Sequence, residues 1–133
     1  MPNDLPQGVK IAQFKDIRKA ISPVAAARDL GDDIVIQGSR AKYTAKPASD
    51  IDFGILVDDN VFQREWQRAF GRKRVGSSDW KTGQHALKVG KIQRGEAGLR
   101  PLAKDLEKIV GKEVDISILR RSSFTDHPVI RVQ

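Results

Sequence analysis

The sequence predicts an α/β (α+β) fold in which a small mixed sheet is flanked by helices. Three short apolar runs, 34–36, 51–57 and 114–119, have the β-branched or alternating pattern of strands. Two longer stretches, 9–21 and 97–110, repeat apolar residues every three or four positions and predict amphipathic helices. Strands separated by helices are typical of a sheet covered by helices.

The limits of the domain and of its first elements follow from length and local signals. The 133 residues suffice for one core, so we expect a single domain over 1–133, with a flexible polar leader at 1–8. Ser22 and Pro23 predict that a second, shorter helix begins after 9–21, because serine caps helices and proline favours their first turn. Gly31 is well placed to end it.

The later elements are predicted in the same way. A brief helix is expected at 39–46, a helix at 61–70, a loop at 71–82, a short helix at 85–89 and an edge strand at 129–132 within a tail, 120–133. The candidate core residues of the helix at 61–70 are Val61, Trp66 and Phe70.

Positive charge is concentrated in one part of the chain. The formal net charge is +7, and the segment 64–100 holds ten Lys and Arg against three Asp and Glu, while the rest of the chain holds fourteen of each. The basic insert and helix over 60–112 therefore predict a contact surface for a polyanion, with a merely solvated surface as the alternative. The candidate RNA-binding residues are Arg72, Lys73, Arg74, Lys81, Lys88, Lys91 and Arg94.

Two absences narrow the class of protein. The chain has no cysteine, which excludes disulfides and thiolate metal sites. No apolar run approaches the length of a membrane span, and the first residues lack the layout of a signal peptide. We therefore expect no membrane segment.

Paired acids mark the candidate site. Asp50 and Asp52 flank Ile51 on a predicted strand, so both carboxylates project from the same face. Two adjacent carboxylates repel each other, and a divalent cation such as Mg²⁺ offsets that repulsion. Asp115 lies on another alternating strand, where it could bind a second cation or accept a proton.

A glycine-serine turn precedes these acids. Gly38 lets the backbone approach a ligand closely, and the hydroxyl of Ser39 with the amides that follow could bind phosphate oxygens. Gly38 and Ser39, ten intervening residues and then Asp50-Ile51-Asp52 resemble the signature of the polymerase β nucleotidyltransferase superfamily, especially its minimal members.

The resemblance implies a polymerase β-like fold and transfer of a nucleoside monophosphate from a nucleoside triphosphate, with Mg²⁺ or Mn²⁺ as cofactor. It implies that Asp50, Asp52 and Asp115 are catalytic residues and metal ligands. Nucleotide binding is implied for Gly38, Ser39 and Arg40. The basic insert between the second and third acids is longer than in compact minimal members.

A second resemblance concerns the run HALKVGKIQRGEAGLRPL, which is similar to nucleotidyltransferase toxin domains of bacterial polymorphic, contact-dependent toxins. It implies an RNA acceptor, with tRNA favoured, and action in the cytoplasm of a target bacterium after delivery within a larger secreted or surface carrier. A cognate, acidic immunity protein would then be a partner. The alternatives are a protein-nucleotidylating (AMPylating) enzyme and a non-catalytic module that binds nucleic acid or a partner; without a carrier, we expect a cytoplasmic location.

Overall fold

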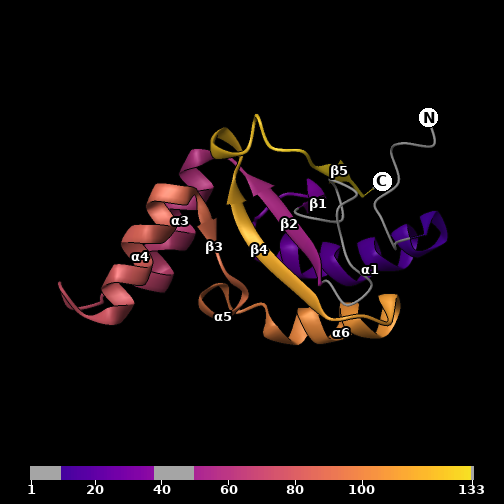
Figure 1. Cartoon of the computed structure of the whole chain (residues 1–133), viewed down its shortest axis with the longest axis horizontal. Coiled ribbons are helices and arrows are strands. Elements are labelled where there is room, and N and C mark those ends of the chain that lie inside the picture. Colours follow the sequence, from indigo (N-terminus) through magenta and orange to yellow (C-terminus); the bar gives the residue numbers. More distant parts are fainter. Residues whose placement is uncertain (1–9, 38–49, 133) are drawn as a thin grey trace.

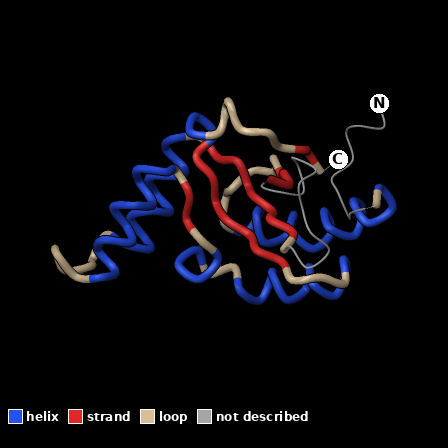
Figure 2. Tube along the Cα trace, in the orientation of Figure 1, coloured by secondary structure: helices blue, strands red, loops and turns tan. Residues whose placement is uncertain are grey.

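The computed structural model describes residues 10–37 and 50–132. These residues form one five-stranded sheet in the order β3-β4-β2-β1-β5, with helices around it (Figures 1 and 2). The strands are β1 (Ile34–Gln37), β2 (Ile51–Val57), β3 (Lys91–Ile92), β4 (Val114–Arg120) and β5 (Ile130–Arg131). The helices are α1 (Ile11–Ala27), α3 (Asp59–Phe70), α4 (Ser78–Val89), α5 (Arg94–Ala97), α6 (Arg100–Val110) and the short 3₁₀ helix η2 (Arg121–Ser123).

The central pair of strands is parallel and the outer pairs are antiparallel, so the sheet is mixed, as predicted. β2 lies beside β4 in parallel, while β1 pairs with β2, β5 with β1, and β3 with β4 in antiparallel fashion. Alternation along β2 and β4 sends one set of apolar side chains to the main core, where α1 and α6 pack. Phe53 and Ile116 are representative of that set, and both are fully buried.

The break predicted at Ser22 and Pro23 is wrong, because α1 runs unbroken from Ile11 to Ala27. Pro23 lies on the exposed side, where water can satisfy the carbonyl group that its missing N–H leaves unpaired. Ile21 and Ala25, on either side of it, are fully buried in the core. Burial of this continuous apolar face offsets the cost of about 3 kcal/mol for a proline inside a helix.

The helices α3 and α4 form a hairpin that projects from one end of the sheet (Figure 1). The predicted loop at 71–82 is too long, because α4 already begins at Ser78. Trp80 and the predicted short helix at 85–89 both belong to α4. Serine at position 77 is the missed signal, because its hydroxyl accepts a hydrogen bond from the Trp80 amide at 3.1 Å. Within α3, Phe70 is buried as predicted, Val61 and Trp66 are partly buried, and Phe62 is an additional core residue.

The predicted helix at 97–110 is present as α6 but begins later, at Arg100; Ala97 is the last residue of α5, which Gly98 ends with a φ of 71°. Just before α5, the two-residue strand β3 pairs with the edge of β4, and its Ile92 is fully buried in the core. The expected edge strand in the tail is present as β5.

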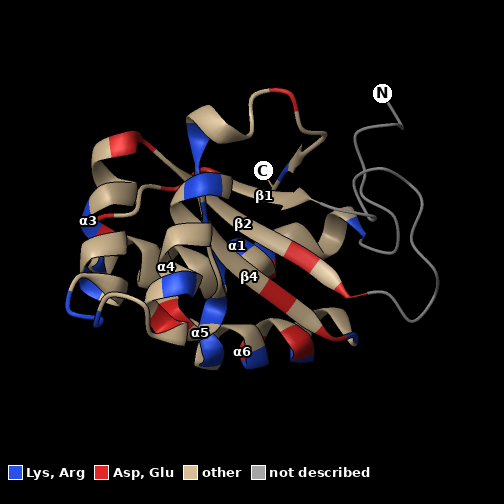
Figure 3. Cartoon of the chain, turned by 60° about the vertical axis from the view of Figure 1, so that its left-hand side comes forward, with Lys and Arg blue, Asp and Glu red and all other residues tan. Residues whose placement is uncertain are grey.

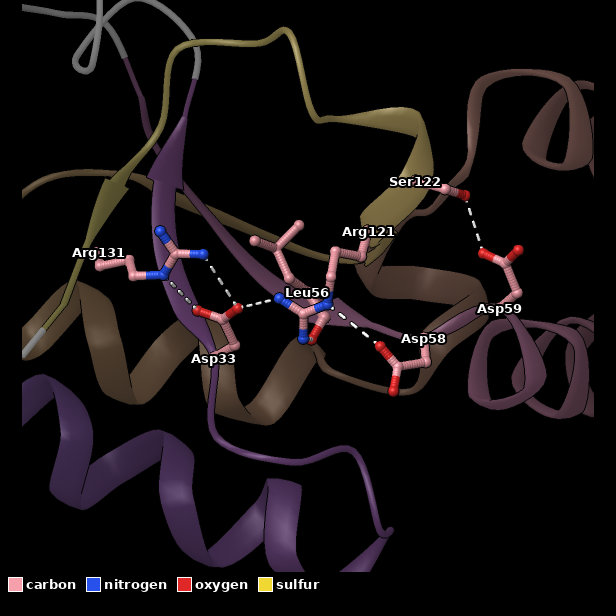
Figure 4. A network of polar contacts seen from close by, with 7 residues as sticks. All are labelled: Asp33, Leu56, Asp58, Asp59, Arg121, Ser122 and Arg131. Atoms are coloured by element: carbon pink, nitrogen blue, oxygen red, sulfur yellow. Dashed lines mark hydrogen bonds and ion pairs between the residues drawn. The ribbon is translucent and has the colours of Figure 1, made fainter.

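The tail covers part of the second face of the sheet. Phe124 and Val129 pack on a small buried cluster of Val35, Leu56 and Leu119. Polar contacts hold the tail in place: the carboxylate of Asp33 accepts hydrogen bonds from Arg121 and from Arg131, as Figure 4 shows. Arg121 also pairs with Asp58 at 3.2 Å, and the Ser122 hydroxyl donates to Asp59 at 2.8 Å. The tail therefore covers the part of this face around Leu56 and Leu119, and a site on β2 and β4 would lie on the part nearer the start of both strands.

Candidate active site

Two carboxylates meet at the centre of the sheet. Asp52 on β2 is the register partner of Asp115 on β4, the adjacent parallel strand. Figure 3 shows the two acidic segments side by side on these strands. Both residues alternate with core-facing neighbours such as Ile51 and Val114, so both project from the face opposite α1 and α6. Asp50, directly before β2, is exposed.

Asp52 is contacted from both sides, by β1 and by β3, the strand beyond β4. The side-chain amide of Gln37, its register partner on β1, donates a hydrogen bond to Oδ1 at 3.3 Å. The ammonium group of Lys91 on β3 lies 3.8 Å from Oδ2. The carboxylate of Asp52 is 26% exposed, so it is still open to a ligand.

The pKa of Asp52 is raised, and burial is the largest cause. Burial raises the pKa of Asp52 above its ordinary value, and the charges of Asp115 and Asp50 raise it further. Lys91 and the hydrogen bond from Gln37 act in the opposite direction without cancelling the rise. A site that disfavours its own negative charge in this way would gain from a bound cation.

The chemistry of these donors fits a hard divalent cation. Carboxylate oxygens are the ligands that Mg²⁺ prefers, and a positive charge, the Lys91 ammonium, already lies against Asp52. Within residues 10–37 and 50–132, no three His, Cys, Asp or Glu side chains converge closely enough to hold a metal ion by themselves. A cation bound here would therefore take other ligands as well, and Mg²⁺ commonly takes waters and phosphate oxygens.

A cavity of about 260 Å³ opens beside the acids on the β4 side. Asp50 and Asp115 line it together with two arginines, Arg94 of α5 and Arg100 of α6. Arg94 is anchored there, since its Nη1 donates to the carbonyl oxygen of Val114 at 2.7 Å. A second cavity, of about 430 Å³, shares both arginines and continues along α6. The sequence analysis missed Arg100, whose only signal was its place within the basic segment.

The seven predicted RNA-binding residues divide into two groups. Two of them lie at the acids: Lys91 beside Asp52, and Arg94 in the cavity with Asp115. The other five are exposed on the α3–α4 hairpin and its turn, away from the acids: Arg72, Lys73, Arg74, Lys81 and Lys88. The predicted nucleotide-binding residues Gly38, Ser39 and Arg40 lie outside the described residues. Gly38 directly follows Gln37, the residue of β1 that contacts Asp52.

Comparison with known proteins identifies the class. A family model described as a nucleotidyltransferase domain matches residues 11–132. The chain belongs to this family, within the polymerase β-like superfamily, and is thus an enzyme that transfers nucleotidyl groups from a nucleoside triphosphate. No curated protein and no solved structure gives a significant match. Among the described residues, no helix is both long and apolar enough to cross a membrane.

Proposed function

We propose that this nucleotidyltransferase moves a nucleoside monophosphate onto a hydroxyl of RNA, with tRNA the favoured acceptor. The observation that carries the proposal is the register pair of Asp52 and Asp115, which has different groups on its β1 side and on its β4 side. On the β1 side the chain leads into Gly38 and Ser39, the predicted phosphate-binding turn. On the β4 side lies the cavity with Arg94 and Arg100.

The three acids have distinct tasks in this proposal. Asp50, Asp52 and Asp115 would hold Mg²⁺ or Mn²⁺ together with phosphate oxygens of the triphosphate, because these three carboxylates, which all belong to the described residues, do not converge closely enough to hold a cation by themselves. Such a cation, when bound, offsets the charge on the phosphate oxygens and on the incoming and departing oxygens of an in-line displacement. Asp115, which lines the cavity together with Asp50 and the two arginines, would also take the proton of the attacking hydroxyl.

The chemistry exchanges one phosphorus–oxygen bond for another. The acceptor oxygen bonds to the α-phosphorus of the nucleoside triphosphate, and the bond from that phosphorus to the pyrophosphate oxygen breaks. Pyrophosphate leaves with the electron pair of the broken bond. The backbone amides after Gly38 and the hydroxyl of Ser39 would hold the triphosphate during this exchange, which positions its α-phosphorus against the acids.

The distribution of positive charge favours a large polyanion as the acceptor. The five exposed Lys and Arg of the hairpin lie at a distance from the acids, in the part of the molecule that Figure 1 shows projecting from the sheet. A small acceptor at the acids would not reach them. A folded RNA such as tRNA is long enough to contact the hairpin while its terminal hydroxyl reaches the site, and counterion release would favour that contact.

The biological setting forms part of the same proposal. The resemblance of residues 85–102 to toxin domains supports a role as an antibacterial toxin domain that acts in the cytoplasm of a target cell. A cognate immunity protein would then cover the cleft or the basic hairpin. An acidic surface on that partner would complement the net charge of +7.

The test is to incubate the protein with each labelled nucleoside triphosphate, bulk tRNA and a bacterial lysate, with Mg²⁺ present. We expect label in RNA, and loss of that label in Asp50→Ala, Asp52→Asn and Asp115→Asn. Asp16→Asn is the matched control, because Asp16 is exposed on α1 and makes no ion pair among the described residues, whereas Asp79 pairs with Lys73 of the basic hairpin. Label found in protein instead of RNA would show that the acceptor is a protein. Binding of the triphosphate without release of pyrophosphate would favour a non-catalytic module.

A further inference from the structure

Arg100 lies against a glycine at the edge of the acid cavity. A Cβ atom added to Gly95 would lie 2.7 Å from Nη2 of Arg100, closer than real Cβ contacts. Gly95 is not among the described glycines with positive φ, so its backbone does not require glycine. The missing side chain therefore makes room for the guanidinium of Arg100 beside Asp50 and Asp115.

The position of Arg100 is unfavourable without a ligand. Arg100 is the first residue of α6, where the positive end of the helix dipole disfavours a cation, and this helix has no acid in its first turn. No ion pair of Arg100 is present among the described residues. Arg94 uses Nη1 for the Val114 carbonyl and keeps its remaining N–H groups. Three carboxylates, those of Asp50, Glu96 and Asp115, line the same cavity as these two guanidinium groups, so an anion would be favoured here when a cation is bound at the acids.

A guanidinium binds two oxygens of a phosphate or of a carboxylate at once, and the proposed RNA acceptor offers phosphates. The order of the strands decides which phosphate. β1, which Gly38 and Ser39 follow in the sequence, lies on the far side of β2, whereas the cavity with Arg94 and Arg100 lies on the β4 side. An attacking hydroxyl must approach opposite the departing pyrophosphate, so the acceptor belongs on the side of the arginines.

We propose that Arg94 and Arg100 bind the last phosphodiester of the acceptor, the one that precedes its attacking hydroxyl. This inference rests on the proposed RNA acceptor. The larger cavity along α6, which shares both arginines and includes Lys104, gives the preceding nucleotides a path away from the acids. Arg100 is thereby a residue that sets the specificity for a phosphorylated acceptor.

The test compares the binding of two short single-stranded RNAs, measured by fluorescence anisotropy with Mg²⁺ present. One is unmodified, and the other has an uncharged methylphosphonate at its 3′-terminal linkage. The wild-type protein should bind the modified RNA about tenfold more weakly, the size of one charge-assisted contact. Arg100→Gln should bind the unmodified RNA about tenfold more weakly than the wild type does, and should discriminate less between the two RNAs, because only Arg94 remains to contact the terminal phosphate.

Two further variants separate position from charge. Gly95→Ala keeps every charge but requires the flexible tip of Arg100 to shift, and should reduce the discrimination between the two RNAs less than Arg100→Gln does. Lys108→Gln removes one charge from an exposed position of the same helix, outside both cavities, and should discriminate like the wild type. Circular dichroism checks that each variant is folded.

The inference is overturned if Arg100→Gln keeps the full wild-type preference for the unmodified RNA, or if it weakens RNA binding no more than Lys108→Gln does. It is also overturned if Arg100→Gln weakens binding of a non-hydrolysable triphosphate instead, because the arginine would then serve the donor. Failure of the proposed function looks different: wild-type protein would transfer no label to RNA at all. If wild-type protein labels RNA and Arg100→Gln discriminates between the two RNAs as the wild type does, the proposed function stands and only the phosphate-binding role of Arg94 and Arg100 is rejected.

Discussion

Replacing Asp52 by asparagine should change the stability of the metal-free protein little, yet remove most of the stabilisation that Mg²⁺ provides. Carboxylates on adjacent strands lie about 5 Å apart, and at an effective dielectric constant near 20 their repulsion is about 3 kcal/mol. The Lys91 ammonium, 3.8 Å from Asp52, supplies an attraction of similar size, and both side chains are about equally exposed, at 24% and 26%. The two terms cancel to within about 1 kcal/mol.

A bound divalent cation would change this balance in the wild-type protein. For an affinity of about 1 mM, 10 mM Mg²⁺ stabilises the folded state by about 1.4 kcal/mol. In a domain of this size that raises the melting temperature by about 5 °C. Asp52→Asn removes one ligand of the proposed metal site, so its melting temperature should rise by less than about 2 °C under the same conditions.

Differential scanning fluorimetry with and without Mg²⁺ measures both effects. Asp79→Asn is the control for the loss of one negative charge, since its side chain is 70% exposed and far more accessible than that of Asp52. A full rise of melting temperature in Asp52→Asn, equal to that of the wild type, would refute the assignment of Asp52 as a metal ligand. A full rise of the melting temperature of Asp52→Asn with Ca²⁺ as well as with Mg²⁺ would likewise refute the assignment of Asp52 as a metal ligand.

The other predictions concern stability and are measured by urea unfolding. Glu65 is buried at 4% exposure and pairs with Arg28, itself only 16% exposed, so Glu65→Gln should cost about 3 kcal/mol. Arg68→Gln, which removes a 58% exposed partner of the same acid, should cost under about 1 kcal/mol; equal losses would contradict this ranking. Burial acts to raise the pKa of Asp33, but hydrogen bonds from two arginines outweigh it and hold that pKa below its ordinary value. Asp33→Asn should therefore cost about 1–2 kcal/mol at pH 7, and the difference from wild type should shrink as the pH falls below about 3.8, where wild type loses this contribution. Gly83→Ala places a Cβ 2.8 Å from the ring of Phe70 in α3 and should lower the free energy of unfolding by about 1–3 kcal/mol. An increase in the free energy of unfolding would show that α3 and α4 can move apart without loss of stability.

Strand alternation allowed the centre of the sheet to be predicted, because one register decides the face of every side chain. The acids Asp52 and Asp115 therefore lie on the same face of adjacent strands. The two-residue strand β3 is too short to leave a periodic signal, so Lys91 was predicted only as a basic surface residue. Its place beside Asp52 depends on pairing with β4, which no local pattern encodes.

Errors in the helices had the opposite origin, since strong local signals were overridden by tertiary packing. Pro23 predicted a helix start, but burial of Ile21 and Ala25 on one face carried α1 through it. Trp80 was placed in a loop because serines and glycines surround it, although one of those serines caps α4. Arg100 could not be predicted as a site residue, because its role depends on a cavity that it lines together with Asp115, a residue of a different element.

The parallel pairing of β2 with β4 also bears on how the enzyme acquires its activity. Its two paired acids are about sixty residues apart in the chain, so they meet only after a long loop has closed. Local helices such as α1 can form earlier, but a partly folded chain that contains them still has no paired carboxylates. Nucleotidyl transfer should therefore appear in a single late step of refolding, together with formation of the central strand pair.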